Sequence, residues 1–451
     1  MGSVIRTTWI QRTLAIFSLC FFSFGFGIAV TQFRIYPYPV LRDANTALNA
    51  LTVVAQPRSI DGLATYQTKT QVPLAISHSE RLDDTYVLLS AGAAAFKSTF
   101  PEGVLAWIVD RKGNVVHHWK SQPGLWDNLE KVTRVPGVSG AISPASLHLC
   151  DNGDLIATYH GHNTFPFGVG IARFDCQSNL IWKKELLTHH SFSVAEDGRI
   201  FVPAVEVVDS PIQVAHTESM IYSDNGKILR DLILVLAPNG DVLDQISVLD
   251  ALFDSGLHGN LLRANASMLT SDDPTHLNDV QLISEADTAQ LPGAAAGDLL
   301  ISMRNINAVG LIDPHSRRFK WFSSGAMMGQ HSPRVYQQGV VAIDNLGGDQ
   351  RLGGTQLTHI DFTTGLPKTL FPRAGVPMPD LCRTVNSGHL DLHRNRNLAL
   401  FSVSHEGAIW EIDLETGKVE WEYIYAQPDV EGGRQMIGPT KYVYDLSFLG
   451  S

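Results

Sequence analysis

One position in a repeated strand–turn–strand pattern of this chain is occupied by histidine four times in five. The pattern is clearest in HSPRVYQQGVVAIDN, which begins at His331, and it recurs at His190, His276 and His389, whereas Ala145 holds the fifth copy. A core strand rarely selects an ionisable side chain so often, because each buried imidazole needs a hydrogen-bonding partner. Imidazole can act as a nucleophile, an acid or a base near neutral pH. The repeated histidine therefore indicates a site of chemistry.

The elements that position these histidines are short strands in a repeating order. Six hairpins combine alternating apolar residues with Asp-x-x-Gly or Pro-Asn-Gly turns, and they span residues 106–119, 172–182, 234–246, 309–322, 358–371 and 410–423. The histidine patterns lie in the intervals between successive hairpins. Two hairpins per repeat make a four-stranded blade. The sequence therefore predicts an all-β fold, a six-bladed β-propeller over residues 84–451, with residues 85–90 and 441–449 closing the ring.

The predicted fold brings the repeated histidines together. The innermost strand of each blade lines the central channel, so equivalent histidines in successive blades converge at one mouth. Arg304 follows the second strand of the His276 blade and can reach the same mouth. The alternative for each histidine is a hydrogen-bonded core imidazole, and for Arg304 it is a surface or inter-blade arginine.

The N-terminal region is predicted to cross a membrane. Residues 14–30 form an uninterrupted apolar run, preceded by Arg6 and Arg12 and followed by no acidic residue before Asp43. By the positive-inside rule, residues 1–13 are cytoplasmic, and the bulk of the chain is periplasmic or otherwise extracytoplasmic. No convincing cleavage site follows the run, which favours an uncleaved signal anchor in the inner membrane over a cleaved signal peptide. Residues 31–83 are predicted to be a membrane-proximal linker with a short helix.

Charge and cysteine content limit the classes of ligand and partner that the chain can bind. The net charge of −11 over 451 residues argues against nucleic acid, because phosphate binding requires a basic face. No CxxC or HExxH spacing is present, so no metal site is predicted. Of the four cysteines, Cys20 lies in the membrane span, and Cys150 with Cys176 is the nearer pair that could oxidise outside the cytoplasm. A homodimer is compatible with the sequence.

The histidine motifs resemble those of the bacterial arylsulfotransferase family. The similarity lies in HHSFSVAEDGRIFV, THLNDVQLI, LLISMRNINAVGLID and QHSPRV with VVAIDN. It implies a six-bladed propeller that moves a sulfuryl group from a phenolic sulfate ester to a phenol, without a cofactor. By this resemblance His331 is the nucleophile that becomes a sulfohistidine, and His276 with Asn278 holds the sulfate oxygens. Arg304 is then the active-site arginine, and His190 lies at the bound phenol and sulfate.

The chain departs from the family pattern at four places, one of which is a short linker between Arg304 and His331 that is predicted to lack a substrate-covering segment. A loop between His276 and Arg304, SEADTAQLPGAAAG, has no assigned role. His389 stands where a small or hydroxyl residue is expected, so it is predicted to add a substrate-binding group. The N-terminal segment that precedes the propeller resembles a membrane-anchored branch of the family, not its soluble periplasmic one.

The chemistry suits these residues independently of the family. Sulfuryl transfer develops negative charge on three oxygens, so positioned cations and N–H donors do most of the work, as in phosphoryl transfer. A neutral imidazole can attack sulfur, the fork of Arg304 suits an oxyanion, and His190 is predicted to carry the proton of the phenol. Two alternatives are a non-catalytic binding scaffold and a PQQ-like quinoprotein dehydrogenase. The second is suggested by DLETGKVEWEY at 413–423, which resembles the tryptophan-docking repeat of such propellers.

Overall fold

The computed structural model consists of two units, residues 1–62 and residues 63–451. It describes residues 2–33, 36–37, 66–67, 74–78, 84–90, 104–133, 135, 142–223, 225–264, 272–425, 433–434 and 437–450. Most of the predicted linker, residues 31–83, lies outside these ranges.

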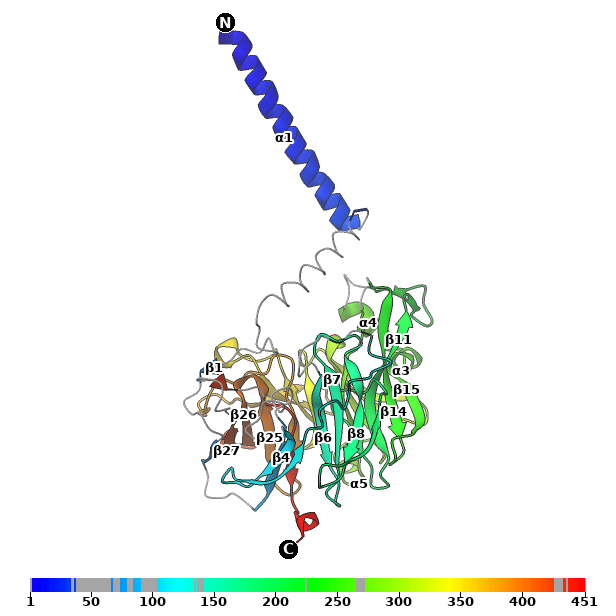
Figure 1. Cartoon of the computed structure of the whole chain (residues 1–451), viewed down its shortest axis with the longest axis vertical. Coiled ribbons are helices and arrows are strands. Elements are labelled where there is room, and N and C mark those ends of the chain that lie inside the picture. The colour runs from blue at the N-terminus through cyan, green and yellow to red at the C-terminus, as the bar shows by residue number, and fades with distance from the viewer. Residues whose placement is uncertain are drawn as a thin grey trace. The chain divides into compact units, whose positions relative to one another are not determined.

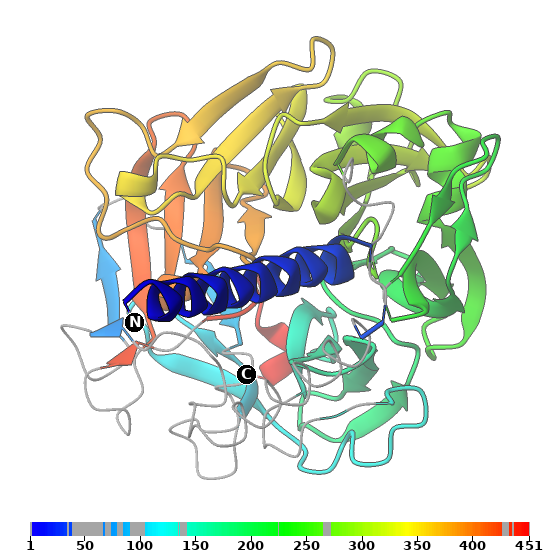
Figure 2. The same ribbon diagram turned by 90° about the horizontal axis from the view of Figure 1, so that it is seen from above.

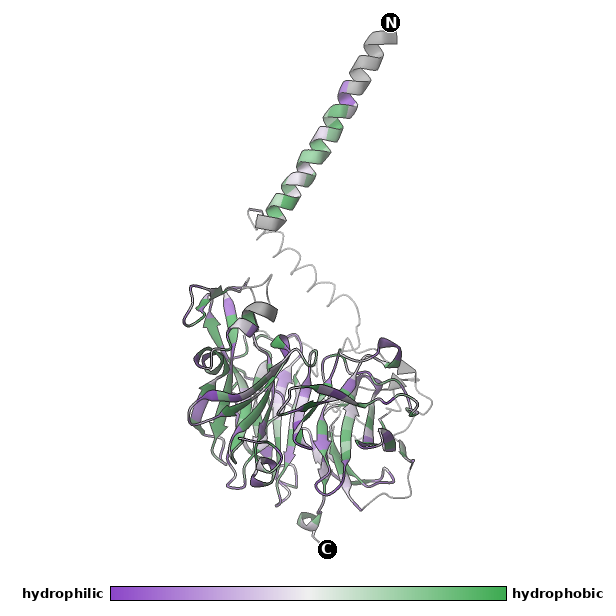
Figure 3. Ribbon diagram, turned by 180° about the vertical axis from the view of Figure 1, so that it is seen from behind, coloured by the Kyte–Doolittle hydropathy of each residue, from purple (hydrophilic) through white to green (hydrophobic). Residues whose placement is uncertain are grey.

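The described part of the first unit includes a long helix, α1 (Gly2–Phe33), drawn in blue in Figure 1. Its segment Gln11–Val30 has a mean hydropathy of 2.1 and is long enough to cross a bilayer. Apolar residues predominate along this segment, and Figure 3 shows its C-terminal half mostly in green. The helix is therefore consistent with a signal anchor or a signal sequence.

The second unit is a six-bladed β-propeller, as predicted, and its sheets are arranged in a ring in Figure 2. Blades 1 to 3 comprise four strands each. Blade 1 is β29 (Thr440–Val443), β3 (Tyr86–Leu89), β4 (Val104–Val109) and β5 (Val115–Lys120); blade 2 is β6 (Ile142–Leu149), β7 (Leu155–Gly161), β8 (Gly168–Phe174) and β9 (Leu180–Lys184); blade 3 is β10 (Ser193–Val194), β11 (Ile200–Asp209), β14 (Lys227–Leu236) and β15 (Val242–Ser247).

Blades 4 to 6 repeat the same antiparallel order, and blade 6 gains a fifth strand. Blade 4 is β16 (Leu277–Leu282), β17 (Leu299–Met303), β18 (Ala308–Asp313) and β19 (Arg318–Ser324); blade 5 is β20 (His331–Tyr336), β21 (Gly339–Asp344), β22 (Gln356–Asp361) and β23 (Pro367–Phe371); blade 6 is β24 (Leu390–Leu392), β25 (Leu398–Val403), β26 (Ala408–Asp413), β27 (Lys418–Ile424) and β2 (Leu74–Ser77). The six predicted hairpins are the third and fourth strands of the six blades. Strand β2 adds to blade 6 ahead of the predicted start of the propeller at residue 84.

Several short strands, helices and 3-10 turns lie outside the blade strands. They are β1 (Tyr66–Gln67) paired with β28 (Gly433–Arg434), a hairpin of β12 (Ile212–Gln213) and β13 (Met220–Ile221), helices α3 (Val248–Asp254), α4 (Gly259–Ala264) and α5 (Glu285–Thr288), and the 3-10 turns η2 (Arg304–Ile306), η3 (Gln350–Leu352), η4 (Ser404–Glu406) and η5 (Ser447–Leu449). Helix α5 lies in the loop that joins β16 to β17. It is the loop SEADTAQLPGAAAG, to which the sequence assigns no role. Because His276 precedes β16 and Arg304 follows β17, this loop lies at the opposite end of blade 4 from both residues.

The ring is closed by pairing the two ends of the propeller sequence. Strand β29 pairs with β3, from Thr440 opposite Leu89 to Val443 opposite Tyr86. The innermost strand of blade 1 therefore comes from the C-terminal end of the chain, as the sequence predicts, and the sheet edge of that blade is covered.

Local side-chain contacts explain why the outer hairpins form. An aspartate at the end of the third strand turns the chain, as when Asp110 accepts hydrogen bonds from the backbone N–H of Lys112 (2.9 Å) and Asn114 (2.8 Å). Asp175, Asp313, Asp361 and Asp413 accept from their turns in the same way.

Tryptophans on the fourth strands join neighbouring blades. Trp182, Trp321 and Trp421 donate Nε1–H at 3.1, 3.0 and 2.9 Å to backbone oxygens in the outer turn of the next blade, those of Pro238, Phe362 and Arg111 respectively. Trp421 belongs to the DLETGKVEWEY segment. The tryptophan-docking contact is thus an inter-blade contact of this propeller, and it is not confined to the blade that suggested a quinoprotein.

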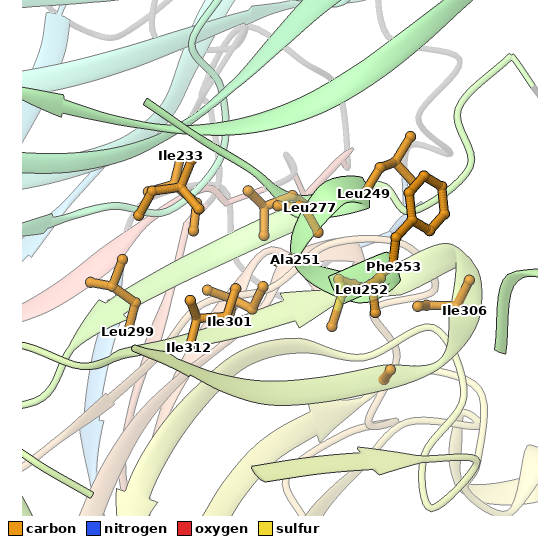
Figure 4. Packing of buried hydrophobic residues seen from close by; sticks show 14 of the residues in the cluster. Ile233, Leu249, Ala251, Leu252, Phe253, Leu277, Leu299, Ile301, Ile306 and Ile312 are labelled. Carbon is orange, nitrogen blue, oxygen red and sulfur yellow. The ribbon is translucent and has the colours of Figure 1, made fainter. Parts of the chain in front are cut away.

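Packing between blades holds the strands that carry the site. In Figure 4, Leu277 at the start of β16 and Ile306 in η2 lie in one apolar cluster with residues of α3, among them Leu252. Leu277 and Ile306 are 0% and 2% exposed. This packing anchors the residues next to His276 and Arg304.

The four cysteines do not pair, so the Cys150–Cys176 disulfide considered from sequence is absent. Cys150 and Cys176 lie in the turns after β6 and β8, and the sulfur of Cys176 instead accepts a hydrogen bond from Gln177 Nε2 at 2.7 Å. Burial raises the pKa of the Cys150 thiol, which keeps it protonated.

Candidate active site

His331, the first residue of β20, has one ring nitrogen that is hydrogen-bonded and one that has no hydrogen-bonding partner. Its Nδ1 lies 2.8 Å from Asn345 Oδ1 and 3.1 Å from the backbone oxygen of Gly329, and both are acceptors. The amide nitrogen of Asn345 donates to the carbonyl oxygens of Thr384 and Ser387, which fixes the orientation of its oxygen. Nδ1 of His331 therefore carries the hydrogen, and Nε2 presents a lone pair. Nε2 is buried and has no hydrogen-bonding partner.

The environment keeps His331 neutral. Burial lowers its pKa to about 3, and the hydrogen bond to Asn345 opposes this shift. The positive charge of Arg304 lowers the pKa further. A neutral imidazole with a free nitrogen lone pair is the form that can attack an electrophile.

His190 and His276 meet His331 at the same mouth of the channel. The ring centroids of His190 and His276 are 5.2 Å apart, and those of His190 and His331 are 6.4 Å apart. His190 and His276 both adopt a left-handed backbone conformation, with φ of 51° and 52°. A non-glycine residue in this region costs of order 1 kcal/mol or more, and such strain clusters at functional sites. The structure thus brings together the three histidines that the repeat pattern singles out.

His190 is surrounded by other imidazoles. Its Nδ1 lies 2.8 Å from Nδ1 of His189, and the rings of His160 and Phe167 are 5.9 and 6.0 Å from its ring. Burial and then the neighbouring His189 and His276 hold the pKa of His190 well below its ordinary value. His190 is therefore neutral at physiological pH.

His276 differs because it contacts a carboxylate. Its Nδ1 forms a hydrogen bond with Oδ2 of Asp273, three residues earlier. The turn that carries both residues is tied to η2, since the backbone N–H of Arg304 donates to the carbonyl of His276 at 3.0 Å and that of Asn305 donates to Thr275 at 3.0 Å.

Arg304 opens η2 directly after β17, as predicted, at the same end of blade 4 as His276. Its Nε is buried without a hydrogen-bonding partner, although the residue as a whole is half-buried. An arginine donor left without a protein acceptor beside a neutral histidine is suited to an anionic ligand.

Asn278 joins two blades near His331. Its Nδ2 donates to the backbone oxygen of Gln330 at 2.8 Å, and Gln330 donates to the carbonyl of Ala308 at 2.9 Å. One amide hydrogen of Asn278 is therefore engaged in positioning the residue before His331, and one remains for a ligand. Its Oδ1 is buried without a partner.

His389 lies on the same channel. Its Nδ1 is 3.4 Å from the hydroxyl of Ser191, and its backbone N–H donates to Ser402 Oγ at 2.7 Å. Burial holds its pKa well below the ordinary value, and the charges of Lys441 and Arg334 lower it further. The side chain is thus a neutral polar group close to His331.

Two partners of the site were not identified from sequence, Asn345 and Asp273. Asn345 ends the stretch that begins at Gly329, and Asp273 lies three residues before His276. Their spacing to the histidines was visible, but their contacts depend on the turns that follow β21 and precede β16. Within the described part of the chain, no three His, Cys, Asp or Glu side chains are arranged to hold a metal ion.

These features define a propeller with a histidine- and arginine-lined channel mouth. The chain belongs to the arylsulfotransferase (ASST) family, whose model matches residues 146–425. The match runs from β6 to the end of β27 and includes every site residue described above. Membership of this family indicates sulfuryl transferase activity on aryl sulfate substrates.

Comparison with other proteins adds only similarity of the chain path. A protein of unknown function from Bacteroides caccae is 11% identical over 80% of this chain and 100% of its own, with a TM-score of 0.46. A streptogramin B lyase is 12% identical over 82% of this chain and 88% of its own, with a TM-score of 0.39. No curated protein matches this chain.

Proposed function

We propose that this protein transfers a sulfuryl group from an aryl sulfate to a phenol through a covalent intermediate on Nε2 of His331. The observation that carries the proposal is the state of His331: Nδ1 is held by Asn345 and Gly329, and Nε2 is buried and has no hydrogen-bonding partner in the protein. Such a nitrogen can attack sulfur without first losing a proton. In the first half-reaction the S–O bond to the donor phenol breaks as the S–N bond forms, and in the second an acceptor phenol reverses the step.

The surrounding groups match the charge that develops on the sulfuryl oxygens. The guanidinium of Arg304 and the remaining amide hydrogen of Asn278, both on blade 4, supply donors to these oxygens. His190 and His389 are neutral, and the ring of Phe167 beside His190 offers a surface on which the aromatic group of the substrate would pack. Neither a metal ion nor an organic cofactor takes part in this scheme.

The test is to trap the intermediate. Incubation with 4-nitrophenyl sulfate in the absence of acceptor is expected to release one equivalent of nitrophenol and to leave one sulfuryl group on His331, found by peptide mass spectrometry. His331→Asn keeps similar size and a donor but lacks the nucleophilic nitrogen, so it should bind the aryl sulfate without the burst. His315→Asn, in the exposed turn after β18, is the matched control and should behave as the wild type.

Two results would contradict the proposal. One is a His331→Asn variant that transfers sulfate at the wild-type rate. The other is initial-rate kinetics that require both substrates to be bound together, since a covalent intermediate predicts ping-pong behaviour.

We further infer that α1 anchors the protein in a membrane with the propeller outside the cytoplasm. The apolar segment Gln11–Val30 and the preceding Arg6 support this orientation. The N-terminal sequence of the mature protein checks the inference, and a sequence that begins after residue 30 would show cleavage of a signal peptide instead.

A further inference from the structure

Two aspartates are gathered behind His276. Asp273 contacts Nδ1 of His276, and the side chains of these two residues are only 20% and 16% exposed. The side-chain amide of Asn305 donates to the backbone oxygen of Asp273 at 2.7 Å, which holds the turn against η2. Nε2 of His276 is thereby left to face the site.

The second aspartate, Asp231, is fully buried in β14. Its Oδ2 accepts hydrogen bonds from the hydroxyl of Thr275 and from the backbone N–H of Leu277, the latter at 2.8 Å. Burial, and then the negative charge of Asp273, raise the pKa of Asp231 to about 7. Well below neutral pH Asp231 is therefore protonated, whereas Asp273 is the aspartate in hydrogen-bonding contact with His276.

The histidines of the site differ in what faces Nδ1. His190 faces another histidine, His331 faces an amide oxygen and His389 faces a hydroxyl, so none of these three has a carboxylate at Nδ1. His276 differs from them in having a carboxylate, that of Asp273, at Nδ1. The titratable and charged groups that face His276 from the neighbouring elements are Asp231, His160, His189, His190, Arg304 and His331, besides Asp273 on its own turn.

We propose that His276, held by Asp273, is the acid and base of the transfer reaction, the role that the sequence predicts for His190. This inference rests on the proposed function. In the first half-reaction the imidazolium of His276 gives its Nε2 proton to the oxygen of the departing phenolate as the S–N bond to His331 forms. In the second, neutral His276 takes the proton of the acceptor phenol as its oxygen attacks sulfur and the S–N bond breaks. Asp273 takes no proton and acts as a positioning residue.

The dependence of the rate on the leaving group separates this role from a structural one. Single-turnover formation of the His331 adduct is measured for a series of aryl sulfates, from 4-nitrophenyl sulfate to phenyl sulfate. Asp273→Asn is expected to react with the nitrophenyl ester within about tenfold of the wild type, because an acidic phenol leaves without a proton. With phenyl sulfate, whose phenol resembles the tyrosine side chain with a pKa near 10, the loss is expected to be on the order of 10²- to 10⁴-fold. Asp273→Glu should recover part of it.

The pH profile gives a second readout. With phenyl sulfate, the fall in rate at high pH should move to lower pH in Asp273→Asn, because an amide does not stabilise the imidazolium. Asp272→Asn is the matched control on the same turn. Asp272 accepts hydrogen bonds from Ser223 and Asn225 and makes none with His276, so this variant should keep the wild-type leaving-group dependence.

A double variant tests whether Asp273 acts only through His276. In a His276→Gln background, adding Asp273→Asn should not lower the rate further, because the imidazole on which the carboxylate acts is already gone. An equal loss for all esters, an unmoved pH profile, or a further loss in the double variant would overturn the role of Asp273 while leaving the His331 adduct intact. Absence of that adduct in the wild-type protein would overturn the proposed function itself.

Discussion

At the scale of single residues, the reactivity of His331 depends on a side chain that lies behind it. Asn345 accepts from Nδ1 of His331 and is itself oriented by the carbonyls of Thr384 and Ser387. One amide therefore joins blade 5 to the loop before blade 6 and selects the tautomer of the proposed nucleophile.

The first prediction concerns Asn345. In Asn345→Ala, Nδ1 of His331 keeps only the oxygen of Gly329 as acceptor, and the rate of adduct formation should fall on the order of 10²-fold. Because the carbonyls of Thr384 and Ser387 each lose the amide donor and keep only a threonine hydroxyl, the free energy of unfolding should fall by about 1–3 kcal/mol. Single-turnover kinetics and urea unfolding check both effects. Asn397→Ala, which removes an exposed amide contact with Glu415, is the control and should change neither.

The second prediction concerns Arg304. Arg304→Lys keeps the charge but loses the planar fork, and Arg304→Gln loses the charge as well. Loss of an oxyanion donor is expected to lower kcat/KM on the order of 10²- to 10³-fold, with the larger loss in Arg304→Gln. Removing the cation should also raise the pKa of His331, although burial keeps it below the ordinary value. Equal rates for wild type and Arg304→Gln would exclude a role in binding the sulfuryl oxygens.

The residue types of the site could be predicted from sequence, because a histidine repeated at one strand position is visible without the fold. The protonation pattern could not. It depends on which group lies in hydrogen-bonding contact with each Nδ1: His189 for His190, Asp273 for His276 and Asn345 for His331. Those contacts are set by turns that have no periodic signature.

At the scale of elements, the innermost strands of blades 3, 4 and 5 are linked inside the channel. The backbone of Asp279 in β16 forms an isolated parallel β-bridge with Ser191 of blade 3. The carboxylate of Asp279 accepts a hydrogen bond from Arg334 of β20 at 3.0 Å. The side chains of Asp279 and Arg334 are 1% and 10% exposed. A buried ion pair thus fixes the spacing of the two strands that carry His276 and His331.

The third prediction follows from this pair. Asp279→Ala leaves Arg334 buried without its partner and should lower the free energy of unfolding by about 3–5 kcal/mol. The double variant Asp279→Leu with Arg334→Met should cost much less than the sum of the single losses, because no uncompensated charge remains. Asp244→Ala breaks the exposed pair with Arg317 and should stay within about 0.5 kcal/mol of the wild type. Additive losses at Asp279 and Arg334 would contradict the proposed coupling.

The hairpins could be predicted because alternation and turn aspartates are local signals, and the insertions could not. The longest interval between the turns of successive hairpins, from Ala237 to Asp313, contains α3, α4 and α5. Strand β2 was missed because its sequence, LAIS, is too short to show alternation. Its place at the edge of blade 6 depends on pairing with β27, which lies near the opposite end of the chain.

At the scale of the whole molecule, the channel and the blades around it bury several neutral histidines. Burial is the largest cause of a lowered pKa for His148, His160, His189, His190, His331 and His389. The pKa falls to about 4 for His148 and about 3 for His160. In the unfolded chain each would return to an ordinary pKa of about 6.5.

The fourth prediction is loss of stability in mild acid. Below pH ~6.5 the unfolded chain takes up protons that the folded protein excludes, so the free energy of unfolding falls as the pH falls. The loss approaches about 1.4 kcal/mol per pH unit for each such histidine, and it continues toward pH ~3–4, where the folded groups titrate. For several histidines together, the loss over roughly two pH units would equal a typical free energy of unfolding of about 5–15 kcal/mol. Urea unfolding at pH 7.5, 6.5 and 5.5 checks this, and equal stability at the three values would contradict it.

Because β3 and its partner β29 come from opposite ends of the propeller sequence, the order of synthesis governs when the ring can form. Translation at about 5–20 residues per second leaves β3 waiting on the order of 20–70 s for the strand that covers its edge. During that time five later blades can fold on the growing chain, but the channel mouth cannot assume its final shape. The ring is therefore complete only once the C-terminal segment that contains β29 has been made. A chain that lacks this segment is expected to expose the unpaired edge of β3, to which a chaperone or another copy of the chain could bind.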